Sequence, residues 1–248
     1  VYPFSVVAVH LTRNGPYTTW PANAVATGVA AGLPHLGAQV SFSGSLVRNL
    51  DTLEAAGYGQ FAGWTVPWTQ WSNAGTALGN PRIDLVAFGE HHPLMPLIDE
   101  SAARKEIQLY KEVYGSVWGA DTSRGMFPPE MAFSERLIPI LEEEGIDWVL
   151  VSSEKISRAC ANFPVVLGTG GVNCDPPNRA DRINPAQDNY HRVQISRGCS
   201  PAEAYPLAMT PQRARHVDPA TGEASEVIVV PCSQSLGWQD GYAPLGLE

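Results

Sequence analysis

The chain has 248 residues, of which 44% are hydrophobic and 17% charged, so it is long enough for one large α/β domain with a substantial core. Its net charge is −9 and no basic run occurs, which argues against nucleic acid or an anionic membrane as a partner. No apolar stretch approaches the roughly 20 residues of a membrane span. An acidic surface containing tryptophans is compatible with a neutral substrate such as a sugar polymer.

Strands and helices alternate in the first part of the chain. Short apolar runs at residues 4–9, 39–43 and 83–88 predict buried strands. Residues 23–32 are compatible with a helix, and residues 45–50 carry apolar side chains at helical spacing. Each strand is thus followed by a segment that can form a helix.

The clearest helix is expected at residues 101–114, where apolar side chains recur close to every 3.6 residues. A strand running into Pro128, a helix at residues 134–144 that stops at Gly145, and a strand at residues 148–151 follow. This alternation predicts a parallel sheet with helical crossovers, either a barrel or a doubly wound sheet.

The regular alternation ends after residue 151. Residues 163–220 are rich in Pro, Gly, Asn and Asp, which predicts long loops with short irregular elements. Residues 228–230 restore one strand. We therefore expect a single domain over residues 1–248 with a loop-rich insertion at residues 156–226.

The four cysteines are Cys160, Cys174, Cys199 and Cys232, and none forms a C-x-x-C pair, which argues against a zinc knuckle or a redox motif. Cys160 and Cys174 flank a Gly-rich loop, where a disulfide would stabilise the fold by about 3 kcal/mol on the loop-closure model. Disulfides are favoured over four free thiols, with their pairing open. A secreted or periplasmic location is accordingly favoured over a cytoplasmic one.

Glu130 follows two prolines, Pro128 and Pro129, and precedes a helix-forming run. Neither proline donates a backbone N–H and each fixes its own φ, so the preceding strand ends there. Glu130 is therefore expected at the C-terminal end of this strand. Carboxylates at the C-terminal ends of barrel strands carry out catalysis. The alternative is a glutamate that only favours the first turn of the following helix.

Other predicted strands also end in ionisable side chains. His10 follows the first strand, Glu90, His91 and His92 follow the third, and Glu154 follows the strand at residues 148–151. All these ends lie on one rim of a parallel barrel, so they form a candidate site. His91 could instead point away from it, and Glu90 could form an ordinary salt bridge.

Tryptophans lie in a Gly-rich segment without clear periodicity. Trp64 and Trp68 are candidates for stacking on sugar faces, although tryptophans in such a segment can equally form a local core.

Four places in chain order carry a family resemblance. His10 ends the first strand, although Leu11 and Thr12 follow it. Residues 43–46 (Ser-Gly-Ser-Leu) lie at the second strand–helix junction, residues 92–97 (His-Pro-Leu-Met-Pro-Leu) follow the third strand, and residues 127–130 (Phe-Pro-Pro-Glu) end the next. Over about residues 4–155 the pattern resembles glycoside hydrolase family 57, with its motifs His-Gln-Pro, His-x-x-x-Pro-Leu and Trp-x-Pro-Glu.

The resemblance implies an α/β fold, an incomplete (β/α)7-type parallel barrel with long irregular loops in its C-terminal part. It implies a retaining glycosidase or transglycosidase acting on an α-glucan-type polysaccharide, with Glu130 as nucleophile and no metal or cofactor. The second carboxyl group should lie about 5–5.5 Å from the nucleophile. His10 and His92 would bind sugar hydroxyls, since imidazole nitrogens can both donate and accept.

The acid/base residue is harder to place. Asp240 is the only late aspartate in a comparable setting, with Trp238 beside it as a further substrate-binding candidate. The residues before Trp238 read as a loop rather than a strand. We therefore expect an N-terminal portion of a barrel, with the acid/base residue beyond residue 248 or on another chain.

Two other functions fit the same residues. A metal-dependent polysaccharide deacetylase would hold Zn²⁺ with His10, with His91 or His92, and with an aspartate. A non-catalytic carbohydrate-binding relative would keep the fold without the chemistry, as the departure from His-Gln-Pro after His10 suggests.

Overall fold

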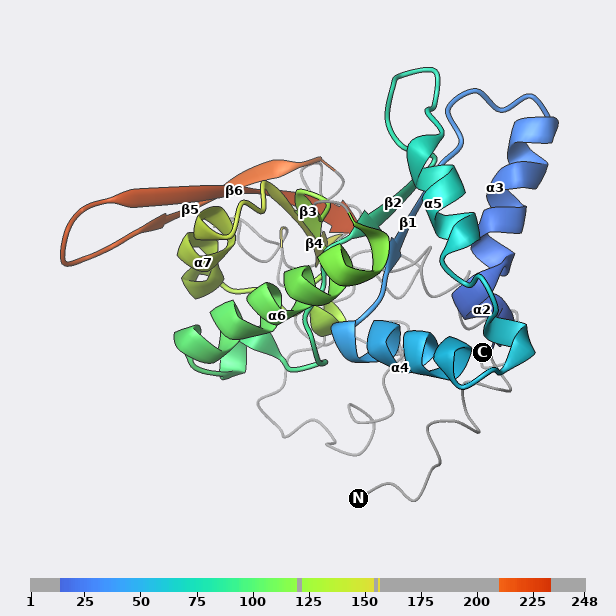
Figure 1. Cartoon of the computed structure of the whole chain (residues 1–248). Coiled ribbons are helices and arrows are strands. Elements are labelled where there is room, and N and C mark those ends of the chain that lie inside the picture. Colours follow the sequence, from blue (N-terminus) through green and yellow to red (C-terminus); the bar gives the residue numbers. More distant parts are fainter. Residues whose placement is uncertain (1–13, 120–121, 154–155, 157–209, 233–248) are drawn as a thin grey trace, which may run out of the picture. The chain divides into compact units, whose positions relative to one another are not determined.

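The computed structural model of the protein describes residues 14–119, 122–153, 156 and 210–232 (Figure 1). The chain divides into two compact units, Val1–Asp147 and Trp148–Glu248. The single domain expected over residues 1–248 stays a prediction, as does the insertion at residues 156–226.

The first unit is built on parallel strands. β1 (Ala38–Ser41) pairs with β2 (Ile83–Val86), with Val40 opposite Leu85. Just beyond β2, Ala87 forms a parallel bridge with Met126 of β3 (Gly125–Met126), so the ends of β2 and β3 lie side by side. Their C-terminal ends consequently open at the same edge, as expected from the sequence.

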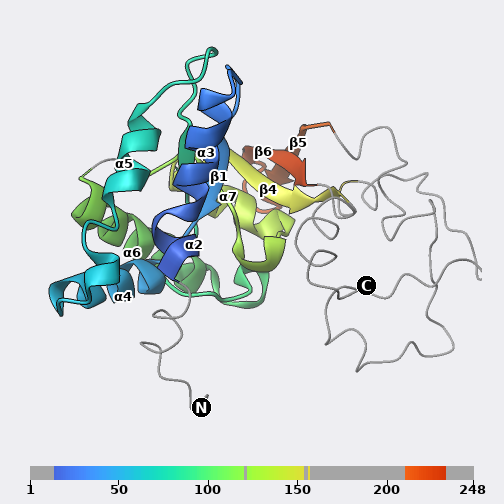
Figure 2. The same cartoon turned by 90° about the vertical axis from the view of Figure 1, so that its right-hand side faces the viewer.

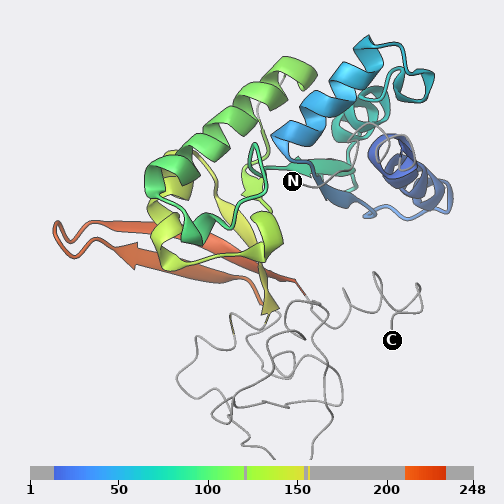
Figure 3. The same ribbon diagram turned by 90° about the horizontal axis from the view of Figure 1, so that it is seen from below.

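Six α-helices are described in this unit: α2 (Asn14–Thr18), α3 (Trp20–Ala30), α4 (Gly44–Ala55), α5 (Val66–Asn73), α6 (Glu100–Trp118) and α7 (Ile138–Glu143). Single 3-10 turns lie at η1 (Gly59–Phe61), η2 (Met95–Leu97), η3 (Pro129–Met131) and η4 (Glu135–Leu137). α3 packs on α5 (Figure 2), and α4 packs on α6 (Figure 3).

The longest helix, α6, confirms the prediction made from its apolar spacing. Ala103, Ile107, Tyr110 and Val113 are all buried on one face. The helix ends at Gly119, whose φ of 63° places it in the left-handed region where glycine is favoured. The hydroxyl of Tyr110 donates to the carbonyl of Val86 at 3.3 Å, which ties α6 to β2.

The second unit contains β4 (Trp148–Ser152), β5 (Gln212–Val217) and β6 (Ala224–Cys232). β6 lies between the other two, parallel to β4 and antiparallel to β5. β5 corrects the prediction of loops through residue 220, and β6 is longer than the strand expected at residues 228–230. In the hairpin turn, the carboxylate of Asp218 accepts from the backbone N–H of Ala220 at 2.7 Å.

An α/β fold is thus confirmed. In the part of the chain that the structure describes, no helix has both the length and the apolar character that crossing a membrane requires.

Candidate active site

Glu130 lies in the η3 turn directly after β3. Its φ is 57° and that of Met131 is 49°, and among the described residues these two alone are non-glycine residues with positive φ. An L-residue in this region costs about 1–2 kcal/mol, and such strain is concentrated at functional sites. Hydrogen bonds from Met131 N to Pro128 O (2.8 Å) and from Ala132 N to Pro129 O (3.0 Å) close the turn. The Glu130 side chain is 65% exposed, so it is presented to solvent by a stiff backbone.

His92, at the end of the segment after β2, lies beside this carboxylate. Its Nε2 is 3.9 Å from Oε1 of Glu130, and its side chain is 56% exposed. The imidazole packs on Phe88 with ring centroids 5.2 Å apart, and Phe88 stacks on Phe127, which precedes the η3 turn. This aromatic stack joins the ends of β2 and β3 and brings His92 to Glu130, as their places on neighbouring strand ends predicted.

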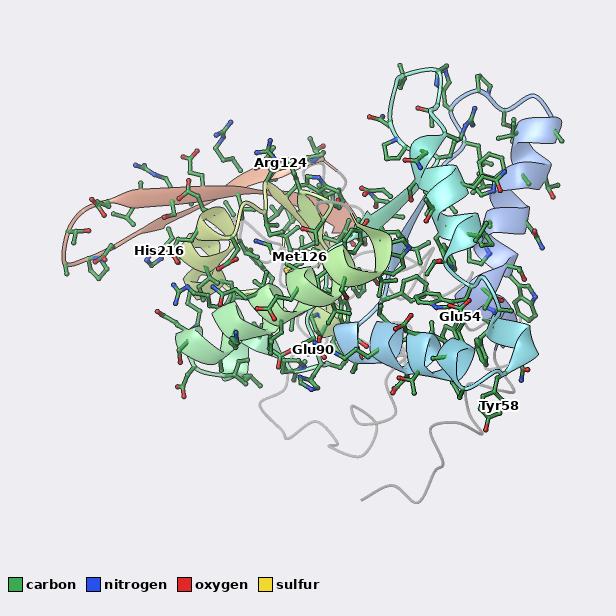
Figure 4. The ribbon with its side chains drawn as sticks, viewed as in Figure 1. Glu54, Tyr58, Glu90, Arg124, Met126 and His216 are labelled. Carbon is green, nitrogen blue, oxygen red and sulfur yellow. The ribbon has the colours of Figure 1, made fainter. Side chains whose placement is uncertain are left out.

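Glu90 is largely buried in a salt bridge, and its prediction as a substrate-binding residue stays a prediction. The residue is only 6% exposed, and its Oε1 accepts from Nε of Arg48 at 2.9 Å. Figure 4 places Glu90 beside the N-terminal end of α4. There the N–H groups of Gly44 and Ser45 donate to the carbonyls of Gly89 and Glu90, at 3.0 and 2.7 Å. The salt bridge considered as the alternative is what forms, because the carboxylate lies beneath the start of this helix.

Position 44 has room for glycine alone in this arrangement. A Cβ at Gly44 would lie 2.0 Å from Oε2 of Glu90 and 3.1 Å from its Cα. The Ser-Gly-Ser-Leu motif thus has a physical role: Ser43 caps α4 by accepting from Leu46 N at 3.2 Å, and Gly44 admits Glu90.

His91 is fixed by a residue that the sequence did not single out. Its backbone N–H donates to Oε2 of Glu106 at 2.7 Å, and its Nδ1 lies 3.0 Å from Oε1 of the same carboxylate. Glu106 comes from α6, next to the buried Ile107. The position of Glu106 beside the buried face of the predicted helix was the only sign of its role in the sequence. The apolar spacing of the helix does not show that its partner is His91.

Trp64 and Trp68 are core residues, so the prediction that they stack on sugars is wrong. They are 1% and 0% exposed, which leaves no ring face for a substrate. Both rings meet Phe42 edge to face, with centroids 6.4 and 5.1 Å apart, and Nε1 of Trp68 donates to the carbonyl of Tyr17 at 3.1 Å. The segment between Gly57 and Asn73 thus buries these two rings against Phe42, directly after β1.

Several predicted site residues lie outside the described residues: His10, Glu154, Trp238, Asp240, Cys160, Cys174 and Cys199. Cys232 is described and is a free thiol, against the disulfide expected for it. Partial burial raises the pKa of this thiol, which disfavours the reactive thiolate. Among the residues that are described, no three His, Cys, Asp or Glu side chains gather as a metal site would require.

An exposed glutamate and histidine at the C-terminal ends of adjacent parallel strands are typical of barrel enzymes. Residues 70–180, which include both motifs that carry these side chains, match the sequence model of Glycosyl hydrolase family 57. The resemblance to this family is therefore confirmed over residues 70–180.

One curated relative and one solved structure are similar to most of the chain. An α-amylase from Niallia circulans is 32% identical over 255 residues, covering 94% of this chain and 19% of the relative. The chain thus spans about a fifth of that curated relative's length. The crystal structure of a 4-alpha-glucanotransferase from Thermococcus litoralis is similar with a TM-score of 0.52 and 13% identity, over 94% of this chain and 26% of that one. The structural likeness supports the α/β fold.

Proposed function

We propose that this chain forms the N-terminal part of an incomplete (β/α)7 barrel in a retaining glycoside hydrolase or transglycosidase that acts on α-glucan. The observation that carries the proposal is the exposed carboxylate of Glu130, held by a left-handed turn at the end of β3 with His92 at 3.9 Å. The family match and the α-amylase relative support the same class of reaction and substrate.

The chemistry assigned to Glu130 is nucleophilic. Its carboxylate oxygen attacks the anomeric carbon while the bond to the leaving oxygen breaks and a second carboxylic acid protonates that oxygen. The resulting glycosyl ester is then attacked by water, or by a sugar hydroxyl in a transglycosidase, with the second carboxylate accepting the proton. A stiff turn suits this role, because the attacking oxygen must be held in line with the anomeric carbon.

His92 is assigned to substrate binding. The 3.9 Å between its Nε2 and the Glu130 oxygen is too long for a direct hydrogen bond, so the ring nitrogen remains available to a sugar hydroxyl. Phe88 supports the ring from one side and fixes its plane. A sugar bound at Glu130 would therefore meet one imidazole held at a defined angle.

The rest of the site is proposed from sequence. Asp240 is the acid/base candidate within the chain, and a residue on further sequence or on another chain is the alternative. His10, Glu154 and Trp238 are proposed to contact the sugar. A secreted or periplasmic location also stays a prediction.

The test is Glu130→Gln, which keeps the shape of the side chain and removes the nucleophile. In the intact protein we expect hydrolysis or transfer of maltooligosaccharides to fall by about 10³-fold or more, while binding measured by calorimetry persists. Glu112→Gln, at an exposed position of α6, is the matched control and should keep wild-type turnover.

Three other outcomes would contradict the proposed function or the role of Glu130. Wild-type turnover in the Glu130→Gln protein would reject Glu130 as nucleophile. Binding of maltooligosaccharides without turnover by the wild type would favour the non-catalytic carbohydrate-binding alternative. Polysaccharide deacetylation that is lost after exhaustive dialysis and restored by Zn²⁺ would favour the metal-dependent deacetylase.

A further inference from the structure

The three residues before His92 are anchored from two helices. The N-terminal end of α4 holds the carbonyls of Gly89 and Glu90, and Arg48 holds the Glu90 side chain. From the opposite side, the backbone carbonyl of Glu106 in α6 accepts from the N–H of Glu90 at 3.0 Å. The segment therefore has fixed partners at each residue up to the one that precedes His92.

The last of these anchors is the carboxylate of Glu106. One oxygen accepts from the backbone N–H of His91 and the other lies 3.0 Å from its ring Nδ1, so both oxygens are used by a single residue. The Glu106 side chain is only 17% exposed, whereas that of His91 is 64% exposed. A hydrogen bond to a largely buried carboxylate is stronger than one in open solvent.

The approach of this carboxylate depends on Gly89. A Cβ at position 89 would lie 3.3 Å from Oε2 of Glu106 and 2.9 Å from Cε of Met95. Glycine at this position thus leaves room for the carboxylate beneath the turn.

The geometry places His92 directly after the residue held at two points by Glu106, and Pro93 restricts its backbone from the other side. With both neighbours constrained, the remaining freedom of His92 lies in its own side chain, which Phe88 supports. Releasing His91 would let the backbone of His92 move and would change its distance to Glu130.

We propose that Glu106 is a positioning residue for the reaction: through the backbone N–H of His91 it sets where His92 stands relative to Glu130. This inference rests on the function proposed above and adds a residue from α6 to its machinery. The carboxylate of Glu106 binds His91 and is assigned no contact with the sugar or with Glu130. Its effect is transmitted by one backbone hydrogen bond, with the His91 ring as a secondary contact.

Three substitutions separate the two contacts. Glu106→Ala removes both, Glu106→Gln keeps one carbonyl oxygen that can still accept from the His91 N–H, and His91→Ala keeps the backbone bond while removing the ring. We expect kcat/KM on maltooligosaccharides to fall about 10–100-fold in Glu106→Ala, because a misplacement of about 1 Å is enough for such a loss. Glu106→Gln should recover most of this loss, and His91→Ala, which keeps the backbone hydrogen bond, should lose less than Glu106→Ala.

The kinetic constants are measured on protein shown to be folded, with Glu112→Gln on the same helix as the control. A merely structural role would lower the melting temperature but leave kcat/KM of the folded protein unchanged in Glu106→Ala. That result, in a protein whose Glu130→Gln variant is inactive, would overturn the positioning role and leave the proposed function standing.

Crystal structures of the wild type and Glu106→Ala make the inference testable even if the wild type shows no turnover. A wild type without turnover counts against the proposed function, and the distance from His92 Nε2 to Glu130 Oε1 then decides the positioning role. Displacement of the imidazole by about 1 Å or more in the variant supports it. An unchanged distance overturns it.

Discussion

The two ends of strands β2 and β3 differ in how their polar groups are satisfied. At the C-terminal ends, Glu130 and His92 are exposed, 3.9 Å apart, and supported by a strained turn. At the N-terminal ends, Arg82 and Arg124 are bound to carbonyls and to a carboxylate at hydrogen-bonding distance. Figure 4 shows Arg124 above Glu90, which lies near the start of α4.

The N-terminal end is a closed set of contacts. The guanidinium of Arg82 donates to the carbonyls of Leu33 (3.1 Å), Leu36 (2.7 Å) and Gly75 (3.1 Å), and so joins the segment between α3 and β1 to the segment between α5 and β2. Arg124 binds both carboxylate oxygens of Asp147, at 2.6 and 2.7 Å. Stabilising contacts thus lie at one end of the strands and the proposed chemistry at the other, the division found in α/β barrels.

The largest expected effect is on activity at the C-terminal end. We predict that His92→Ala lowers kcat/KM on maltooligosaccharides by about 100-fold, because the sugar loses a positioned hydrogen bond that the transition state uses. Steady-state kinetics and a thermal melt measure this. His35→Ala, an exposed histidine before β1, is the control. Equal kinetics for both variants would contradict the division.

Arg82→Ala should do the reverse. It leaves three carbonyls without their charged donor, so we predict a loss of about 2 kcal/mol in the free energy of unfolding with kcat unchanged in the folded protein. Arg82→Lys should recover only part of the loss, since one ammonium group cannot reproduce the planar fork. Urea denaturation tests both variants, and a fall in kcat of the folded protein would show that the two ends are coupled.

Met131→Gly should exchange activity for stability. Glycine adopts a φ of 49° without strain, which removes about 1–2 kcal/mol, while its greater freedom in the unfolded chain costs about 0.5–1 kcal/mol. We predict a net stabilisation of about 0.5–1 kcal/mol together with a several-fold lower kcat, because Glu130 is then held less firmly. Ala132→Gly, at an ordinary φ of −72°, should only destabilise. Differential scanning calorimetry distinguishes the pair.

The smallest effect is a pH dependence away from the site. Partial burial would by itself raise the pKa of Glu144, but hydrogen bonds from Lys111 and Gln108, and the charges of Lys111 and Arg104, hold this pKa below its usual value. A lowered folded-state pKa means that the carboxylate stabilises the fold above the unfolded-state pKa of about 4.3, and that this stabilisation is lost as pH falls through the folded-state pKa.

Glu144→Gln should therefore lower stability at pH 7 by about 0.5–1 kcal/mol, and the difference from wild type should disappear in acid. Denaturation curves over a pH series measure it. Glu112, which lies in solvent at 3.9 Å from Lys105, provides the control substitution and should show little pH dependence. A constant difference between Glu144→Gln and wild type at all pH values would contradict this assignment.

Sequence patterns predicted the elements whose residues carry their own local signal. The apolar spacing of α6 and the two prolines before Glu130 both act within a few residues, so the helix and the end of the strand before Glu130 were predicted, whereas the turn at Glu130 was not. The meeting of His92 and Glu130 followed from a rule of topology, since parallel strands end on one edge.

What the sequence did not reveal depends on contacts between distant residues. Trp68 is buried by Phe42 and by the backbone of Tyr17, which lie 26 and 51 positions away, so nothing near it marks it as core. Glu106 is likewise 15 positions from His91, and the hydrogen bond between them forms only because tertiary packing brings α6 next to the segment after β2. β5 is held by its pairing with β6 and has no buried residue, so its sequence lacks the apolar pattern from which a strand is predicted.

The fit between Gly44 and Glu90 has a practical consequence for protein engineering. The first turn of α4 and the loop after β2 are so close at Gly44 and Glu90 that a larger residue at position 44 would collide with the loop. The two segments must therefore be exchanged together. A chimera that takes this loop from a related protein but keeps the recipient's own start of α4 would lose the fit between positions 44 and 90. Both segments should therefore be taken from the same parent.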